Sequence, residues 1–203
     1  MPSIEKNSPL GRTPRSILRS AALVGAYLDR ADLRGMNLSN ANLTGASLRG
    51  ADLSDAVLRN TILIRADLSR ACLYRADLEG AILDAADLSM SYAKCASFKD
   101  ARMRHCSLRG ANYKNCFFWG TDLWGSDFRG AFMLGTVFDD AILTNTRNLH
   151  HALFFWYRDP VHGGGPVYEP RKGFVKIARS VIPGYSFQEN AGMGRVKGWT
   201  SEG

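Results

Sequence analysis

Apolar and small residues recur every five positions between residues 16 and 145, which divide into 26 consecutive five-residue units without an insertion. The central residue of a unit, here called the centre, is Leu in 18 units, and the residue two places before it is Ala in 17. The last residue, here called the corner, is Gly, Asn or Asp in 17 units. A period of five matches neither the 3.6-residue period of an α-helix nor the two-residue period of a strand.

This pattern predicts a chain that turns a corner every five residues and points one small and one large side chain inward on each side. Gly, Asn and Asp tolerate the dihedral angles of tight turns, so they suit the corners. Four sides make a coil of 20 residues, and stacked coils would pair their backbones at about 4.8 Å per coil. The 130 periodic residues would then form about six and a half coils and a rod of roughly 31 Å.

The same units carry a recurrent Ala-(Asp/Asn)-Leu motif. It is present at Ala31-Asp32-Leu33, Ala41-Asn42-Leu43, Ala51-Asp52-Leu53, Ala66-Asp67-Leu68, Ala76-Asp77-Leu78 and Ala86-Asp87-Leu88. In these residues the chain resembles the pentapeptide-repeat family, and the resemblance extends over the whole periodic segment from 16 to 145. The resemblance implies an all-β fold, a right-handed quadrilateral parallel β-helix.

Four segments follow from the change in pattern along the chain. We expect an extended N-terminal arm over 1–15, the solenoid over 16–145, a C-terminal cap over 146–159 and a basic tail rich in Gly, Pro and aromatic residues over 160–203. A β-solenoid exposes backbone and core at its ends, which must be covered. The apolar residues expected to form the cap are Leu149, Leu153, Phe154, Phe155 and Trp156.

Charge is concentrated at the two ends of the sequence. The chain has a formal net charge of +7, but residues 21–145 hold 14 basic and 14 acidic residues. The apolar stretches are too short for a transmembrane helix, and no secretory signal precedes the repeats. The four cysteines lack the C-x-x-C spacing of a zinc site and do not suggest a disulfide framework. We therefore expect a cytoplasmic location, or one within a virus or phage particle.

The positions after the centre include a run of basic residues followed by tryptophan. If residues 20 apart are stacked, Lys99 lies on Trp119 and Arg104 on Trp124. Cations beside aromatic rings suit a phosphate backbone or a stacked base, but they are also found on ordinary solvated surfaces and in protein interfaces. The candidate polyanion patch consists of Lys94, Lys99, Arg104, Arg109, Lys114 and Trp119.

One side of the predicted rod carries outward apolar residues where Asp or Asn is usual. An exposed apolar strip on a rigid rod is typical of a contact surface. Cover by the tails of the same chain, or no role at all, would explain it too. The candidate partner interface consists of Ile62, Ile64, Ile82, Trp124 and Ile142.

Catalytic, metal and cofactor sites find little support. Cys106 and Cys116 occupy the small inward position, where they replace Ala as core residues. Cys95 and His105 are ten residues apart, which places them on opposite sides of a four-sided tube and separates a nucleophile from its base. His150 and His151 lack a companion at metal-ligand spacing. We expect no enzymatic activity, no cofactor and no bound metal.

Three functions remain open at this point. The first is a structural or protein-interaction module, a rigid rod docked in a larger assembly through its apolar strip and terminal arms. The second is a basic rod that binds nucleic acid or another polyanion. The third, implied by the resemblance alone, is the DNA-mimic role of relatives that bind DNA gyrase, which requires an acidic rod and is disfavoured by the balanced charge found here. The oligomeric state is not indicated.

Overall fold

The computed structural model describes residues 18–149 and 152. The N-terminal arm predicted for 1–15 and the tail predicted for 160–203 lie outside the described residues. Within the described part, no helix has the length and apolar character needed to cross a bilayer.

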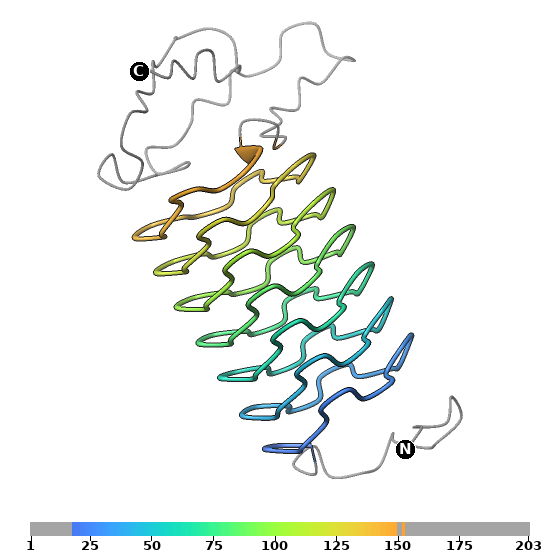
Figure 1. Cartoon of the computed structure of the whole chain (residues 1–203). Helices are drawn as coiled ribbons and strands as arrows, with labels where there is room; N and C mark the ends of the chain where they lie inside the picture. Colours follow the sequence, from blue (N-terminus) through green and yellow to red (C-terminus); the bar gives the residue numbers. More distant parts are fainter. Residues whose placement is uncertain (1–17, 150–151, 153–203) are drawn as a thin grey trace, which may run out of the picture.

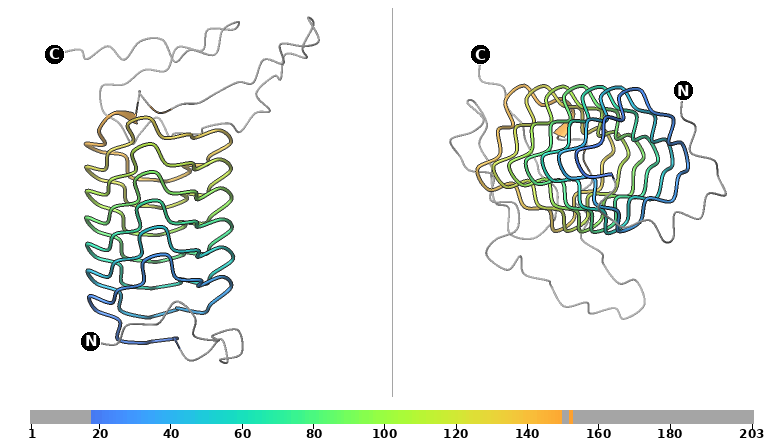
Figure 2. Two further views of the ribbon diagram at one scale, coloured as in Figure 1. Left: turned by 90° about the vertical axis from the view of Figure 1, so that its right-hand side faces the viewer. Right: turned by 90° about the horizontal axis from the view of Figure 1, so that it is seen from below.

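The described chain winds into a four-sided, right-handed parallel β-helix in which each five-residue unit forms one side (Figure 1). The residue before each centre forms a parallel bridge with the residue 20 positions later, from Ala22↔Asn42 to Asp127↔Arg147. Each strand is therefore a single bridged residue, at five-residue intervals between Ala22 and Arg147. Figure 2 shows the coils stacked one on the next along the rod axis. This confirms the predicted fold class.

The 20-residue register defines four faces. Face 1 holds the centres at positions 18, 38 and so on to 138, and face 2 holds those from 23 to 143. Face 3 runs from 28 to 128 and face 4 from 33 to 133. We number the coils from the N-terminal end, so that coil 1 begins at residue 16, coil 2 at 36 and coil 7 at 136.

Every corner residue from Ser20 to Asn145 has a left-handed backbone, with φ between 54° and 70°. A hydrogen bond closes most of these turns, as between Ala21 N–H and the Leu18 carbonyl at 3.2 Å. Ala85 and Met90 hold the same left-handed conformation, although it costs roughly 1–2 kcal/mol for a residue with a Cβ atom. Backbone pairing with the coils on either side imposes the turn where the residue type does not favour it.

The preference for Asp or Asn before the centre has a hydrogen-bonding cause. In a typical unit four of the five backbone N–H groups bond to backbone carbonyls, and the N–H after the centre does not. The Asp or Asn side chain accepts that fifth N–H, as Asn42 Oδ1 does from Thr44 N at 3.1 Å and Asp87 Oδ1 from Ser89 N at 2.8 Å. These carboxylates therefore serve the repeat geometry, by satisfying a backbone donor.

The inward positions form one continuous core in which centres from Leu33 to Leu143 are almost completely buried. On face 1 the C-terminal coils replace Leu by Phe. The rings of Phe98, Phe118 and Phe138 form a parallel stack with centroid separations of 4.9 and 5.2 Å. Because these separations nearly match the backbone spacing of about 4.8 Å, one ring fits each coil.

Thr, Ser and Cys replace Ala at the small inward position, and several of them satisfy their polar atoms in the same way. Each such hydroxyl or thiol donates to the carbonyl of the centre 23 residues earlier in the chain. Thr121 donates to Phe98 O at 2.7 Å, Cys106 to Leu83 O at 3.0 Å and Cys116 to Ala93 O at 2.7 Å. The sequence prediction that Cys106 and Cys116 are core residues agrees with their burial.

On face 4 an unusually small centre is followed in the next coil by an unusually large one. Ala93 is the one small centre among the 26 units, and the centre directly above it is Tyr113. The Tyr113 ring is completely buried and packs edge-on against Phe98 and Phe118. Neither its hydroxyl nor that of the buried Ser91 has a well-aligned hydrogen-bond partner in the described part of the chain. The small Ala93 side chain thus leaves room for a larger residue in the next coil.

The C-terminal end of the rod begins to close within the described residues. Leu149 and Ala152 are buried against the core, and Asn148 Nδ2 donates to Asp127 Oδ1 at 2.8 Å. The pKa of Asp127 is lowered: burial raises it, but the Asn148 and Arg129 hydrogen bonds and the nearby Arg109 and Arg147 outweigh burial. The other predicted cap residues, Leu153, Phe154, Phe155 and Trp156, lie outside the described residues.

Candidate interaction surfaces

The five cations of the candidate polyanion patch do not share a surface. Five consecutive units make more than one turn of the tube, so Lys99, Arg104 and Arg109 lie on faces 1, 2 and 3. Lys94 and Lys114 alone share a face, face 4. The structure therefore replaces the single patch read from the sequence by three separate cations and one pair.

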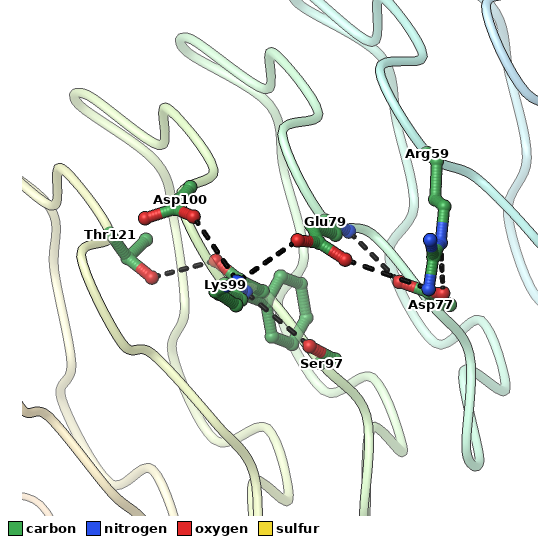
Figure 3. Close-up of polar contacts among 8 residues, drawn as sticks. Arg59, Asp77, Glu79, Ser97, Lys99, Asp100 and Thr121 are labelled. Carbon is green, nitrogen blue, oxygen red and sulfur yellow. Dashed lines mark hydrogen bonds and ion pairs between the residues drawn. The ribbon is translucent and has the colours of Figure 1, made fainter.

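Those three separate cations are engaged by carboxylates. Lys99 Nζ lies 3.1 Å from Glu79 Oε1 and 3.7 Å from Asp100 Oδ2. Figure 3 shows this lysine within a ladder on face 1 that continues from Glu79 to Arg59 and Asp77. The hydrogen bond and charge of Glu79 raise the pKa of Lys99. Because these carboxylates already neutralise much of its charge, the lysine attracts a phosphate less strongly than an unpaired lysine would.

Arg104 and Arg109 follow a rule that covers several ion pairs of the rod. A cation that follows one centre meets the carboxylate that precedes the centre of the next coil on the same face. Arg104 Nε lies 2.6 Å from Asp122 Oδ2 and Arg109 Nε 3.9 Å from Asp127 Oδ2. Asp122 raises the pKa of Arg104 by its hydrogen bond and its charge. The fixed sequence spacing of these pairs was the signal that could have revealed them.

The expected stacking of cations on tryptophans is not present among the described residues. The register itself is as predicted, because Asp100 N bonds to Trp119 O and His105 N to Trp124 O, both at 2.8 Å. The two tryptophan side chains nevertheless contact residues other than the expected cations. Trp119 Nε1 donates to Asp140 Oδ2 at 3.2 Å, and the Trp124 ring meets the His105 ring edge-on at 4.5 Å.

The candidate apolar interface lies on face 2, as expected, but it is divided into two parts. Ile62 and Ile82 are bridged directly to each other, and the next two residues of that column are Arg102 and Asp122. Arg102 also pairs with Asp84 at 2.8 Å. Ile62, Ile64 and Ile82 are half-buried, whereas Trp124 and Ile142 are 37% and 44% exposed. A charged belt therefore separates the lower isoleucines from the upper part of the strip.

The upper part continues onto face 1, which the sequence interpretation missed. Phe117 and Trp119 are 49% and 52% exposed on face 1 of coil 6. We call Phe117, Trp119, Trp124 and Ile142 the C-terminal apolar patch, since they lie on two adjacent faces of coils 6 and 7. Phe117 stands where Asp or Asn usually precedes the centre, and that departure was a readable signal.

Ile142→Asn should stabilise the rod by about 0.5–1 kcal/mol. The equivalent unit of coil 2, Ala41-Asn42-Leu43-Thr44, shows an Asn side chain accepting the Thr44 N–H, and Ile142 cannot provide this for Thr144. Ile142 is exposed, so little apolar burial is lost. Urea unfolding followed by circular dichroism measures the change. The reverse variant Asn42→Ile should lose a similar amount, and a gain from it would contradict the hydrogen-bonding account.

Reactive side chains are not gathered into a catalytic arrangement in the described part of the chain. Burial raises the pKa of the Cys106 and Cys116 thiols, which disfavours the nucleophilic thiolate. Cys95 lies at a corner of face 4 and His105 at a corner of face 2, on opposite sides of the tube as expected. Residues 18–149 and 152 contain no group of three or more His, Cys, Asp or Glu residues that could hold a metal ion.

Comparison with known proteins identifies the family to which the repeat belongs. A family model described as pentapeptide repeats matches eight copies between residues 16 and 145. No curated protein matches the chain. The chain is similar to a trypsin-treated variant of QnrB1, a plasmid-mediated fluoroquinolone resistance protein, with 24% identity and a TM-score of 0.55 over 66% of this chain and 78% of that one.

Two further solved structures are similar at lower scores. A pentapeptide repeat protein from the thylakoid lumen of Arabidopsis thaliana is 23% identical, with a TM-score of 0.36 over 62% of this chain and 74% of that one. HetL, involved in heterocyst differentiation regulation in Nostoc, is 24% identical, with a TM-score of 0.23 over 67% of this chain and 75% of that one. The likeness to QnrB1 supports the fold of the described solenoid.

Proposed function

The chain belongs to the pentapeptide-repeat family, and from this premise we propose that it is a non-enzymatic interaction module. In this proposal the rod binds a protein partner through the C-terminal apolar patch. The terminal arms, which lie outside the described residues, would contribute to docking in a larger assembly.

The exposure of the C-terminal apolar patch is the observation that carries the proposal. Two tryptophans, one phenylalanine and one isoleucine are 37% to 52% exposed on two adjacent faces. Trp and Phe are enriched in the buried centres of protein interfaces, whereas isolated exposed apolar residues need no explanation. Four of them within two coils at one end of a rigid rod favour recognition of an apolar surface on a partner.

The charges of the rod support the same function. Many of its carboxylates are paired with Arg or Lys or cap backbone N–H groups, so the surface lacks the unbalanced acidic field of a DNA mimic. QnrB1 confers fluoroquinolone resistance, but the likeness to it supports the fold alone. The balanced charge of the rod gives no support to binding of DNA gyrase by this chain.

The test is an affinity capture in which three forms of the full chain are used to retain a partner protein from an extract of the native source. Wild type and Tyr27→Ala should retain the same protein in stoichiometric amount, whereas Trp119→Ala/Trp124→Ala should retain roughly tenfold less, as expected when interface hot spots are lost. Tyr27 is a matched control because it is 68% exposed on face 3 of coil 1, remote from the patch. Equal retention by all three forms would refute the proposed patch.

A further inference from the structure

Face 4 differs from the other faces in the charge that its middle coils carry. Between residues 56 and 135, faces 1, 2 and 3 each contain Asp or Glu, whereas the units at 71–75, 91–95, 111–115 and 131–135 contain none. The cations of these units therefore have no carboxylate on their own face within coils 3 to 6. Arg75 reaches Asp55 of coil 2 at 3.0 Å, but Lys94 and Lys114 form no ion pair among the described residues.

Lys94 and Lys114 occupy the same position in successive coils. Cys95 N bonds to Lys114 O at 2.9 Å and Arg75 N to Lys94 O at 3.1 Å, so the column reads Tyr74, Lys94, Lys114. Like charges placed directly over one another at about 4.8 Å destabilise a sheet. Arg109 and Arg129 on face 3 are stacked in the same manner, but there Asp127 Oδ2 lies 3.9 Å from Arg109 Nε and supplies a counter-charge. On face 4 the repulsion is left without a counter-charge from the described rod.

Two tyrosines neighbour Lys94 in the register, because Tyr92 belongs to the same five-residue unit and Tyr74 precedes Lys94 by one coil in its column. The rings of Tyr74 and Tyr92 are stacked with centroids 6.3 Å apart and an interplanar angle of 29°. Tyr92 is 41% exposed, so part of its side chain is accessible to a ligand. Unpaired cations beside accessible rings, on a groove or face free of carboxylates, are the means by which proteins bind single-stranded nucleic acid without reading its sequence.

We propose that face 4 binds single-stranded nucleic acid, with Lys94 and Lys114 contacting phosphates and the Tyr74–Tyr92 pair stacking on a base. This goes beyond the protein-binding function proposed above and uses a different face of the rod. Of the six residues of the polyanion patch predicted from sequence, the inference keeps only these two lysines. Lys99, Arg104 and Arg109 are excluded because carboxylates already engage them.

The test measures fluorescence anisotropy of a labelled oligothymidylate, longer than the roughly 4–16 nucleotides that compact sites cover, with the full-length chain. Lys94→Ala/Lys114→Ala should weaken binding on the order of tenfold at low salt and reduce the slope of log affinity against log salt by about 1.4. Lys99→Ala/Arg109→Ala removes the same charge from ion-paired positions and should have a much smaller effect. Tyr92→Ala should weaken binding roughly tenfold without changing the salt slope.

Three results would overturn the proposal. Equal weakening by both double variants would assign binding to overall basic charge, which the two ends of the chain supply. A second such result has two parts: polyglutamate displaces the labelled oligonucleotide as readily as unlabelled oligonucleotide does, and Tyr92→Ala binds the oligonucleotide with unchanged affinity. Together they would indicate a surface for acidic protein segments. Absence of binding at low salt would exclude the site. Thermal unfolding checks that the variants fold, and removal of the stacked lysines should raise the melting temperature slightly.

Discussion

Phe118→Ala is expected to lower the free energy of unfolding by about 3–5 kcal/mol, the usual cost of removing a fully buried phenylalanine. Phe118 is the middle ring of the face 1 stack, with Phe98 at 4.9 Å and Phe138 at 5.2 Å. It also receives the edge of Tyr113 at 5.4 Å. The rings above and below are fixed by their own coils, so they cannot close the cavity. Urea unfolding monitored by far-ultraviolet circular dichroism measures the loss.

The neighbouring residue supplies the control for this prediction. Phe117 points outward and is 49% exposed, so Phe117→Ala should cost less than about 1 kcal/mol. The pair of variants removes the same side chain from the inside and the outside of one side of the tube. Similar losses from both would contradict the assignment of inward and outward positions on which the fold rests.

Alkaline pH should destabilise the rod through two thiols that the fold keeps protonated. Burial raises the pKa of Cys106 and Cys116 far above the ordinary value of 9.0. The unfolded chain releases these protons above pH 9, while the folded chain retains them, so stability present below pH 9 is lost as the pH rises. Each group contributes up to about 1.4 kcal/mol per pH unit, so the two thiols together remove about 5 kcal/mol between pH 9 and 11. Urea unfolding at pH 8, 9, 10 and 11 measures the slope.

A hydroxyl in place of each thiol isolates this contribution. Cys106→Ser/Cys116→Ser retains a donor for the Leu83 and Ala93 carbonyls, in the manner in which Thr121 serves Phe98, but a serine does not titrate in this range. The double variant should therefore show a shallower decline above pH 9. A residual decline is expected from Tyr113, since burial raises its pKa well above 10.0. An unchanged slope would show that the thiols are not responsible.

The candidate surfaces were predicted from sequence only in part, and the reason is geometric. The 20-residue register placed Ile62, Ile82 and Ile142 in one column correctly. The sequence interpretation overlooked that the same register places Arg102 and Asp122 in that column, because it followed only the unusual residues. It also treated five consecutive units as one basic patch, although consecutive units lie on different faces.

Side-chain pairing was the harder feature to predict. Lys99 and Trp119 are adjacent in backbone register, yet the lysine turns toward Glu79 and the indole toward Asp140. The choice between a carboxylate and a ring depends on distances within one or two coils in both directions along the rod. A local sequence pattern does not contain those distances.

The five-residue repeat by itself determined the course of the backbone, because only one small and one large inward side chain per side can fill a tube with four corners. It determined the stacking of successive coils and the burial of Leu, Ala and the two inward cysteines as well. The tertiary structure alone decided which of its possible neighbours each outward side chain contacts, since those neighbours belong to successive coils and are distant along the chain. It decided which cations are neutralised by carboxylates, and it left Lys94 and Lys114 together on the one face whose middle coils carry none.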